Sequence, residues 1–437
     1  MFDHVMTEDL AAIARSLARL APATSDSDRI DRIRILEVIK SAAAAAQAQE
    51  TAAFCASQKA AQRDAGVPSK DVGKGVAAQV GLAKRESPFR ASRYVGWTHI
   101  LTSELPRTFA ELQAGRTSER RAEIVAQQTA WLSVEDRATV DQEMAPRLSE
   151  WGDRQVEAET KRLAYRLDPH GYLARQAKAE ADRRVTLRPA PDTMTILSGL
   201  LPVTHGVAVF AALKRCADSL RAQGDERTRG QIMADTLVER VTGQVSADAV
   251  SVEVKLVMTD QALFNHGQGS DEPAVVEGLG PIPAELARRM ALTAADHATL
   301  WLRRLYASPD SGQLVAMESR RRTFSGALAE FLITRDQICR TPWCDAPIRH
   351  SDHVVPAEYG GPTTPSNGQG LCEGCNYAKQ APGWRASPGP AGAGDIVEIV
   401  TPTRHVYRTR APDPPGTHTR ACPECDELAR QVSRQAA

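Results

Sequence analysis

Four cysteines near the end of this chain form two closely spaced pairs, and this is the arrangement of residues that most strongly indicates chemistry. Four residues separate Cys339 from Cys344, and two separate Cys372 from Cys375. Both separations are typical of structural zinc sites, and four thiolates complete a closed tetrahedral shell around the ion. The alternative is a group of reduced cysteines without metal. Two such pairs so close together in the sequence favour zinc.

Three polar residues beside these pairs are suited to a second metal. Asp352 offers a carboxylate oxygen and Asn376 an amide oxygen, the hard donors that Mg²⁺ or Mn²⁺ prefers. His353 follows Asp352 in an expected strand, so their side chains point to opposite faces; one can bind metal while the other reaches water. Each residue alone is also explained as an ordinary polar loop residue. Together with the cysteine pairs, they predict a catalytic metal site.

About 50 residues carry a family resemblance. The chain reads Asp-His-Val-Val-Pro over 352–356, has Asn367 in the following loop, and reads Cys-Glu-Gly-Cys-Asn-Tyr-Ala-Lys over 372–379. This pattern resembles the HNH endonucleases, whose catalytic unit is a ββα-metal finger. Asn stands at the third motif position in place of His, which is the H-N-N variant of the family.

The resemblance implies a role for each motif residue. His353 is expected to be the general base, Asp352 and Asn376 to hold the catalytic Mg²⁺ or Mn²⁺, and Asn367 to brace the loop between the strands. His350 shares a strand face with Asp352, so it is either a further metal or phosphate contact or an exposed histidine without a role.

Several basic residues are candidates for binding nucleic acid. Lys379 and Arg385 lie close to the motif, and either they contact phosphate or they are simply solvated. Arg320, Arg321 and Arg322 lie just upstream of the motif, in an expected basic helix over 317–335. A further basic stretch over 161–188 is either a DNA-backbone face or a solvated helix surface.

Composition describes a protein of 437 residues that is too long for one ordinary core. Its net charge is zero, so the overall charge gives no indication of nucleic-acid binding. Any DNA-binding surface must therefore come from local basic patches. The N-terminal residues lack the pattern of a signal peptide, and no apolar run approaches the roughly 20 residues that span a bilayer. We therefore expect a cytoplasmic location and no membrane partner. There, cysteines serve as metal ligands more often than in disulfides. Cys55 and Cys216 are expected to be ordinary thiols.

The elements that precede the motif are expected to be mostly helical. The apolar spacing and the breakers predict helices and strands as follows: helices over 31–62, 111–126, 134–167 (capped by Ser133), 203–223, 228–242, 283–293 and 317–336, and strands over 184–188, 193–197 and 251–258. Residues from about 30 to 322 resemble the helical domain of unknown function that precedes HNH modules in a large actinobacterial family. The stretches that carry this resemblance are 184–192, 227–231 and 279–283.

These observations combine into one expected architecture: a mainly α N-terminal domain followed by a small α+β, zinc-stapled ββα-metal (HNH) domain. The expected parts are an extension (1–30), the helical domain (31–316), a basic connecting helix (317–335), the nuclease domain (336–385), a linker with a C-terminal hairpin (386–412) and a tail (413–437). In the tail, Cys422 and Cys425 have no visible partners.

The expected function is metal-dependent hydrolysis of phosphodiester bonds in nucleic acid, with double-stranded DNA as the expected substrate. The alternative is a catalytically silent, zinc-stabilised module that only binds nucleic acid. The sequence leaves sequence specificity, the choice between DNA and RNA, the choice between nicking and double-strand cleavage, and oligomeric state undetermined.

Overall fold

The computed structural model describes residues 7–244, 256–264, 271–277, 279–297, 324, 326–389 and 395–413. The chain divides into two compact units. One comprises residues 1–64 and 93–173, and the other comprises 65–92 and 174–437. The second unit is therefore built from two separate stretches of the chain, and it contains all the motif residues. Among the described residues, no helix combines the length and apolar character needed to cross a membrane.

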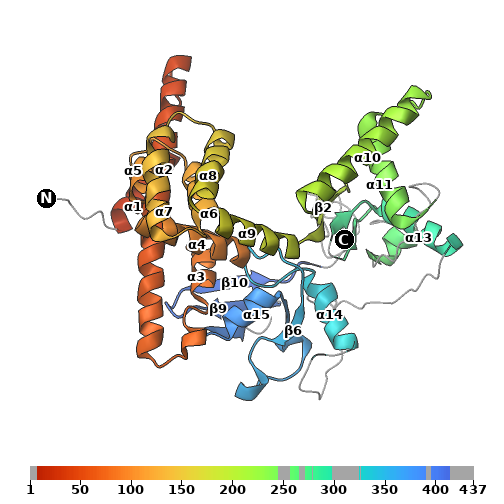
Figure 1. Ribbon diagram of the computed structural model, residues 1–437. Coiled ribbons are helices and arrows are strands. Elements are labelled where there is room, and N and C mark those ends of the chain that lie inside the picture. The colour runs from red at the N-terminus through yellow and green to blue at the C-terminus, as the bar shows by residue number, and fades with distance from the viewer. Residues whose placement is uncertain are drawn as a thin grey trace. The chain divides into compact units, whose positions relative to one another are not determined.

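The first unit is helical (Figure 1). Its helices and short 3₁₀ turn, including two helices that continue into the second unit, are α1 (Thr7–Ala18), α2 (Asp26–Asp64), α4 (Pro88–Glu104), α5 (Pro106–Gln113), α6 (Glu119–Thr129), α7 (Val134–Met144), η2 (Ala145–Arg147), α8 (Asp153–Leu167) and α9 (Pro169–Ala181). Its core consists of side chains that are almost entirely buried, among them Leu101, Leu105, Leu112, Val125, Val140, Met144, Leu148 and Leu163.

Two of the long helices expected here are interrupted. The helix expected over 111–126 is divided by a turn at Gly115, whose φ of 69° lies in the left-handed region. The helix expected over 134–167 does begin after its Ser133 cap, which accepts a hydrogen bond from the Asp136 amide. It ends at Met144, because Pro146 lacks the amide hydrogen that a continuing helix requires. In both places the sequence analysis predicted one helix where the structure has two.

The second unit starts with the helix α3 (Val76–Lys84) and continues after α9 with a β-hairpin and a helical pair. The expected strands and helices are present as β1 (Arg184–Pro189), β2 (Thr195–Leu200), α10 (Val203–Ala222) and α11 (Arg229–Thr242). Thr228 and Gln231 form a capping box that starts α11. A small sheet of order β3-β4-β5 follows, with α12 and α13: β3 (Leu256–Val257), α12 (Asp260–Phe264), β4 (Ala274–Val276), β5 (Gly280–Ile282) and α13 (Ala284–His297). The rest of the strand expected over 251–258 lies outside the described residues.

The motif region forms a small α+β domain, as the sequence predicts. It comprises α14 (Ala327–Asp336), β6 (His350–His353), the 3₁₀ turns η4 (Ala357–Tyr359) and η5 (Pro365–Asn367), β7 (Gly368–Leu371) and α15 (Glu373–Lys379). The strands β8 (Arg385–Pro388), β9 (Ile396–Val400) and β10 (Val406–Arg410) form a second sheet of order β10-β9-β8. The expected C-terminal hairpin thus gains a third strand from a stretch that the sequence analysis assigned to the domain and its linker.

The helix before the motif is shorter than expected in its described part. α14 begins at Ala327, directly after Gly326, whose φ is 56°. Residues 317–323, with Arg320, Arg321 and Arg322, lie outside the described residues. The described helix packs Leu328, Phe331 and Leu332 together with Phe324 into a buried cluster beside the motif.

The helix α3 packs against the motif domain within the second unit. Thr403 in the turn between β9 and β10 donates a hydrogen bond to the Gln79 side chain of α3, at 3.1 Å. The N-cap of α3 is Gly75, and a β-carbon there would lie 2.5 Å from Nε1 of Trp384. A stretch that lies 240 or more residues before the motif in the chain is thus part of the same packed body.

Candidate metal centres and nuclease site

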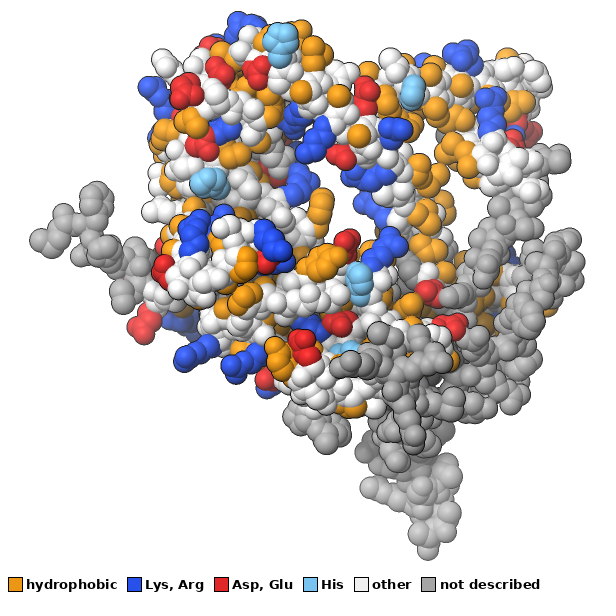
Figure 2. Space-filling model, turned by 60° about the horizontal axis from the view of Figure 1, so that its bottom comes forward, with side chains coloured by type: hydrophobic (Ala, Val, Ile, Leu, Met, Phe, Trp, Pro, Cys, Tyr) orange, Lys and Arg blue, Asp and Glu red, His pale blue; other side chains and the backbone are white. Residues whose placement is uncertain are grey.

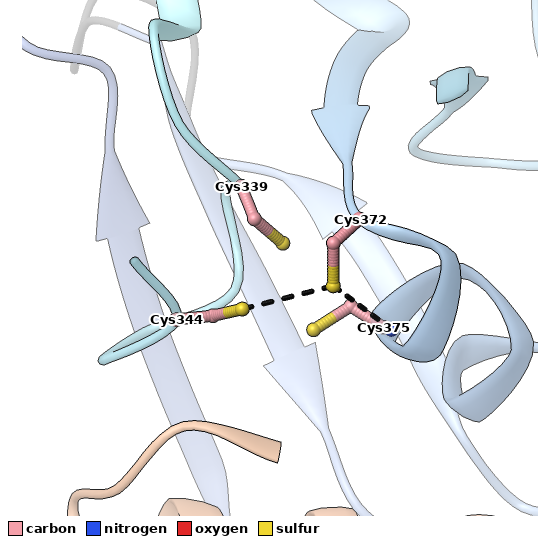
Figure 3. A group of neighbouring side chains, drawn as sticks. All are labelled: Cys339, Cys344, Cys372 and Cys375. Atoms are coloured by element: carbon pink, nitrogen blue, oxygen red, sulfur yellow. Dashed lines mark hydrogen bonds between the residues drawn. The ribbon is translucent and has the colours of Figure 1, made fainter. Parts of the chain in front are cut away.

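The four motif cysteines meet at one point. Figure 3 shows two sulfur atoms coming from the loop after α14 and two from the start of α15, all pointing toward a common centre. Every pair of the four Sγ atoms lies within 4.8 Å, and Cys344 Sγ lies 3.7 Å from Cys372 Sγ. Tetrahedral zinc with Zn–S bonds of about 2.3 Å requires sulfur atoms about 3.8 Å apart. The cluster therefore has the dimensions of a zinc site.

Local structure holds the cysteines in place. Cys372 is the N-cap of α15, and its sulfur accepts a hydrogen bond from the Cys375 amide at 3.4 Å. Cys339 and Cys344 lie in a loop that is closed by a hydrogen bond from the Cys339 amide to the Ala346 carbonyl. Hydrogen bonds from neighbouring thiols, that of Cys339 first, lower the pKa of Cys372. The thiolate, the form that binds zinc, is thus favoured at Cys372, whereas hydrogen bonds from neighbouring thiols raise the pKa of Cys344 and Cys375.

The strands β6 and β7 pair antiparallel and present the catalytic candidates. Asp352 lies opposite Gln369, and His353 lies opposite Gly368. A β-carbon at Gly368 would lie 2.7 Å from Leu332 and 2.8 Å from Phe324, so only glycine lets the strand approach this cluster so closely. The expected two strands and a helix are thus present, with α15 packed against β6.

His353 is held in a buried position. Its side chain is 7% exposed, its Nε2 lies 2.9 Å from the Thr363 hydroxyl, and its ring centre lies 4.6 Å from that of Phe324. Burial lowers the pKa of His353, whereas Asp352 raises it and Lys379 lowers it further. The net direction favours the neutral imidazole, which is the form that accepts a proton.

Asp352 faces a lysine. The Lys379 ammonium, on the last turn of α15, forms an ion pair with the Asp352 carboxylate and also donates to the main-chain carbonyl of His353. The two side chains are 13% and 26% exposed, respectively, so water screens this pair only partly. The Asp352 carboxylate, which the sequence analysis predicted to be a metal ligand, is therefore stabilised by a neighbouring positive charge.

Asn376 carries a buried oxygen with no partner. The residue is 8% exposed, and its Oδ1 accepts no hydrogen bond from any described residue. A buried amide oxygen without a donor is unfavourable by about 1–3 kcal/mol. A divalent cation shared with the Asp352 carboxylate would satisfy this oxygen, so the residues present fit the implied metal. Asn376 lies within α15, which starts at Glu373.

Asn367 stabilises the loop between β6 and β7 through hydrogen bonds from its side chain. Its side-chain nitrogen donates to the carbonyl groups of Val355 and Pro362, at 3.0 and 2.8 Å, and its Oδ1 accepts from the Val355 amide at 2.9 Å. It is 3% exposed. These three bonds give the side chain the contacts that the expected bracing role requires.

A buried ion cluster supports β7 from the other side. Asp336 is fully buried and accepts hydrogen bonds from Arg335, Arg340 and the Gly370 amide. Arg335 also donates to the carbonyl groups of Pro365 and Gly368. The sequence analysis passed over all three residues of this cluster, because charged residues at the end of a helix are usually solvated.

The remaining basic candidates lie in different surroundings. His350 is partly exposed and lies beside Tyr377, with ring centres 6.4 Å apart, while Arg385 is exposed on β8. In the basic stretch over 161–188, Lys161 pairs with Glu157 and Arg162 with Glu159. Figure 2 likewise shows acidic side chains interspersed among the basic ones on the face that it displays. These pairs favour the solvated surface over a DNA-backbone face for the start of this stretch.

Two strands and a helix joined to a four-cysteine cluster, with the motif residues on them, match the arrangement expected of an HNH endonuclease domain. A family model described as HNH endonuclease matches residues 337–381, and a model described as a domain of unknown function (DUF222) matches residues 36–336. The chain belongs to the DUF222 family, with the HNH domain following directly, in the order that the sequence predicts. Its HNH domain implies a nucleic-acid substrate.

A relative of similar length exists in Mycobacterium tuberculosis. The uncharacterized protein Rv3776 is 27% identical to this chain over 427 residues, which cover 83% of this chain and 80% of the relative. No solved structure matches the chain.

Proposed function

We propose that this protein is a metal-dependent endonuclease that hydrolyses phosphodiester bonds in double-stranded DNA, with His353 as the general base. The observations that support the proposal are two oxygen donors on the neighbouring elements β6 and α15 and, next to Asp352 in the chain, a buried histidine whose lowered pKa favours the neutral imidazole. Asp352 offers a carboxylate and Asn376 an unsatisfied buried amide oxygen. A module that only binds nucleic acid has no need for that arrangement, since the cysteines alone are enough to stabilise it.

Each residue has a separate task in this reaction. The imidazole of His353 takes a proton from the attacking water. Asp352 and Asn376 would hold a Mg²⁺ or Mn²⁺ ion, which would supply neutralisation of negative charge on the scissile phosphate and on the leaving 3′ oxygen. The four cysteines hold a structural Zn²⁺ that fixes the start of α15, and with it the position of Asn376.

The activity is tested with supercoiled plasmid DNA and purified full-length protein. We expect nicked or linear DNA with Mg²⁺ or Mn²⁺ and none after EDTA. An RNA of matched sequence, run in parallel, tests the choice of DNA. A protein that binds both nucleic acids but cuts neither would favour the silent binding module.

A further inference from the structure

Among the residues that the structure describes, Thr363 is the only hydrogen-bond partner of either ring nitrogen of His353. The bond joins Thr363 Oγ1 to His353 Nε2, at 2.9 Å, and both side chains are more than 90% buried. Phe324 covers the ring, with centres 4.6 Å apart. The ring is therefore fixed in orientation, and one of its two nitrogens is committed to a hydroxyl group.

A neutral imidazole carries one N–H and one lone pair, so the partner of one nitrogen decides what the other can do. If Nε2–H donates to Thr363, the lone pair is on Nδ1, which is then able to accept a proton from water. If Thr363 donates instead, the Nε2 lone pair is occupied and Nδ1 carries the hydrogen. Only the first arrangement leaves a base.

We propose that Thr363 is a positioning residue that accepts a hydrogen bond from His353 Nε2–H and so makes Nδ1 the basic nitrogen of the nuclease. This inference rests on the proposed role of His353. It adds a residue that the HNH motif positions chosen from the sequence do not contain.

The loop is constructed to keep Thr363 at this place. Asn367 binds the carbonyl of Pro362, the residue before Thr363, at 2.8 Å. On the other side, Thr364 caps the turn η5 through a hydrogen bond from the Asn367 amide. A β-carbon at Gly361 would lie 1.8 Å from the Val355 carbonyl oxygen, so a side chain there would displace the loop. Asn367 thus helps to fix the loop position of Thr363, and Thr363 in turn contacts His353.

The test compares Thr363→Val, which keeps the shape but lacks the hydroxyl, with Thr363→Ser, which keeps the hydroxyl. Thr409→Val, a substitution of the same kind on β10, is the matched control. We expect Thr363→Val to cut DNA about 10–100-fold more slowly, a part of the roughly 10²–10⁴ that a general base contributes, with unchanged DNA affinity. Thr363→Ser and Thr409→Val should cut like wild type. If Thr363→Val does not fold, Thr363→Ala replaces it with the same expectation.

A second readout is independent of cleavage. Proton–nitrogen correlation spectra of protein labelled with ¹⁵N-histidine distinguish the two neutral tautomers, and the signal missing in His353→Gln identifies His353 among the ten histidines. We expect the Nε2–H tautomer in wild type and Thr363→Ser, and its loss in Thr363→Val. An Nδ1–H tautomer in wild type, or a Thr363→Val protein with wild-type spectrum and cleavage, would overturn the inference. If His353→Gln itself cuts like wild type, the proposed function fails instead, and the spectra alone decide the role of Thr363.

Discussion

At the scale of single residues, the carboxylate of the proposed metal site already has a cationic partner. Lys379 pairs with Asp352, the same group that the proposed Mg²⁺ or Mn²⁺ requires. The ammonium repels a divalent ion bound to the same carboxylate, so the lysine should lower the apparent affinity for the proposed metal. Lys379 is thus a candidate for tuning this metal, in addition to its earlier candidacy as a phosphate contact.

Removal of this charge should therefore strengthen metal binding. We expect Lys379→Met to bind Mn²⁺ on the order of tenfold more tightly, because a partly buried charge pair is worth one or more kcal/mol. Lys379→Arg keeps the charge and should keep the wild-type Kd. Calorimetric titration with Mn²⁺, without DNA, measures the difference. Equal Kd values for Lys379→Met and wild type would show that the lysine does not compete.

At the scale of elements, a stretch far from the motif in sequence supports the nuclease domain. Gly75, at the N-cap of α3, has a φ of 77° and no room for a β-carbon beside Trp384. Gly66 has nearly the same φ, 76°, but nothing lies within 4 Å of the position of its β-carbon. Substitution of the two glycines therefore distinguishes the effect of backbone strain, which both positions share, from the effect of packing, which only Gly75 adds.

Alanine at these two positions should have different effects. Gly66→Ala should lower the free energy of unfolding by about 1 kcal/mol, from backbone strain alone. Gly75→Ala adds overpacking, which typically amounts to about 1–3 kcal/mol. Thermal and urea unfolding, followed through tryptophan fluorescence, compare the two. If both variants lose the same stability, α3 does not pack on the nuclease domain as the structure describes.

The sequence predicted the elements whose signals are local. Ser133 and Thr228 mark the starts of helices through their own side chains, and the alternation along β9 reports which of its faces is covered. The joined helices over 111–126 and 134–167 show the limit, because apolar spacing continues across a short break. In the site, the sequence motif predicts residues whose spacing is fixed along the chain: the cysteine pairs, Asp352, His353, Asn367 and Asn376. Thr363 and Asp336 are not among them, since Thr363 meets His353 only through the fold of the loop between β6 and β7, and Asp336 meets the Gly370 amide only where α14 packs on β7.

At the scale of the whole molecule, zinc should determine whether the nuclease domain folds. Its sheets are short, and the buried cluster around the cysteines contains few other apolar side chains. We expect one zinc ion per chain in purified protein, because binding energy at such sites contributes directly to folding. Cys372→Ser should lose the ion and melt at a lower temperature, whereas Cys55→Ser should keep it. Metal analysis and calorimetric melting measure both, and a zinc-free wild type would contradict this expectation.

The basic residues before the motif should increase the affinity for DNA. Replacing Arg320, Arg321 and Arg322 by glutamine should reduce the slope of log affinity against log salt by about three, roughly one for each lost phosphate contact. As a control, Arg29, Arg32 and Arg34 form ion pairs within α2, and their replacement should leave the slope unchanged. Binding of a short duplex at several salt concentrations gives both slopes. A wild-type slope for the first triple variant would show that these arginines do not contact DNA.

The most direct measurement of the central claim is DNA cleavage by His353→Ala. We expect a rate about 10²–10⁴-fold below wild type, with zinc content, melting temperature and DNA affinity nearly unchanged, because the imidazole only takes a proton from water. His405→Ala, at an exposed histidine in the turn between β9 and β10, should cut like wild type. Cleavage by His353→Ala at the wild-type rate would contradict the account, and His350 would then be the first alternative base to test.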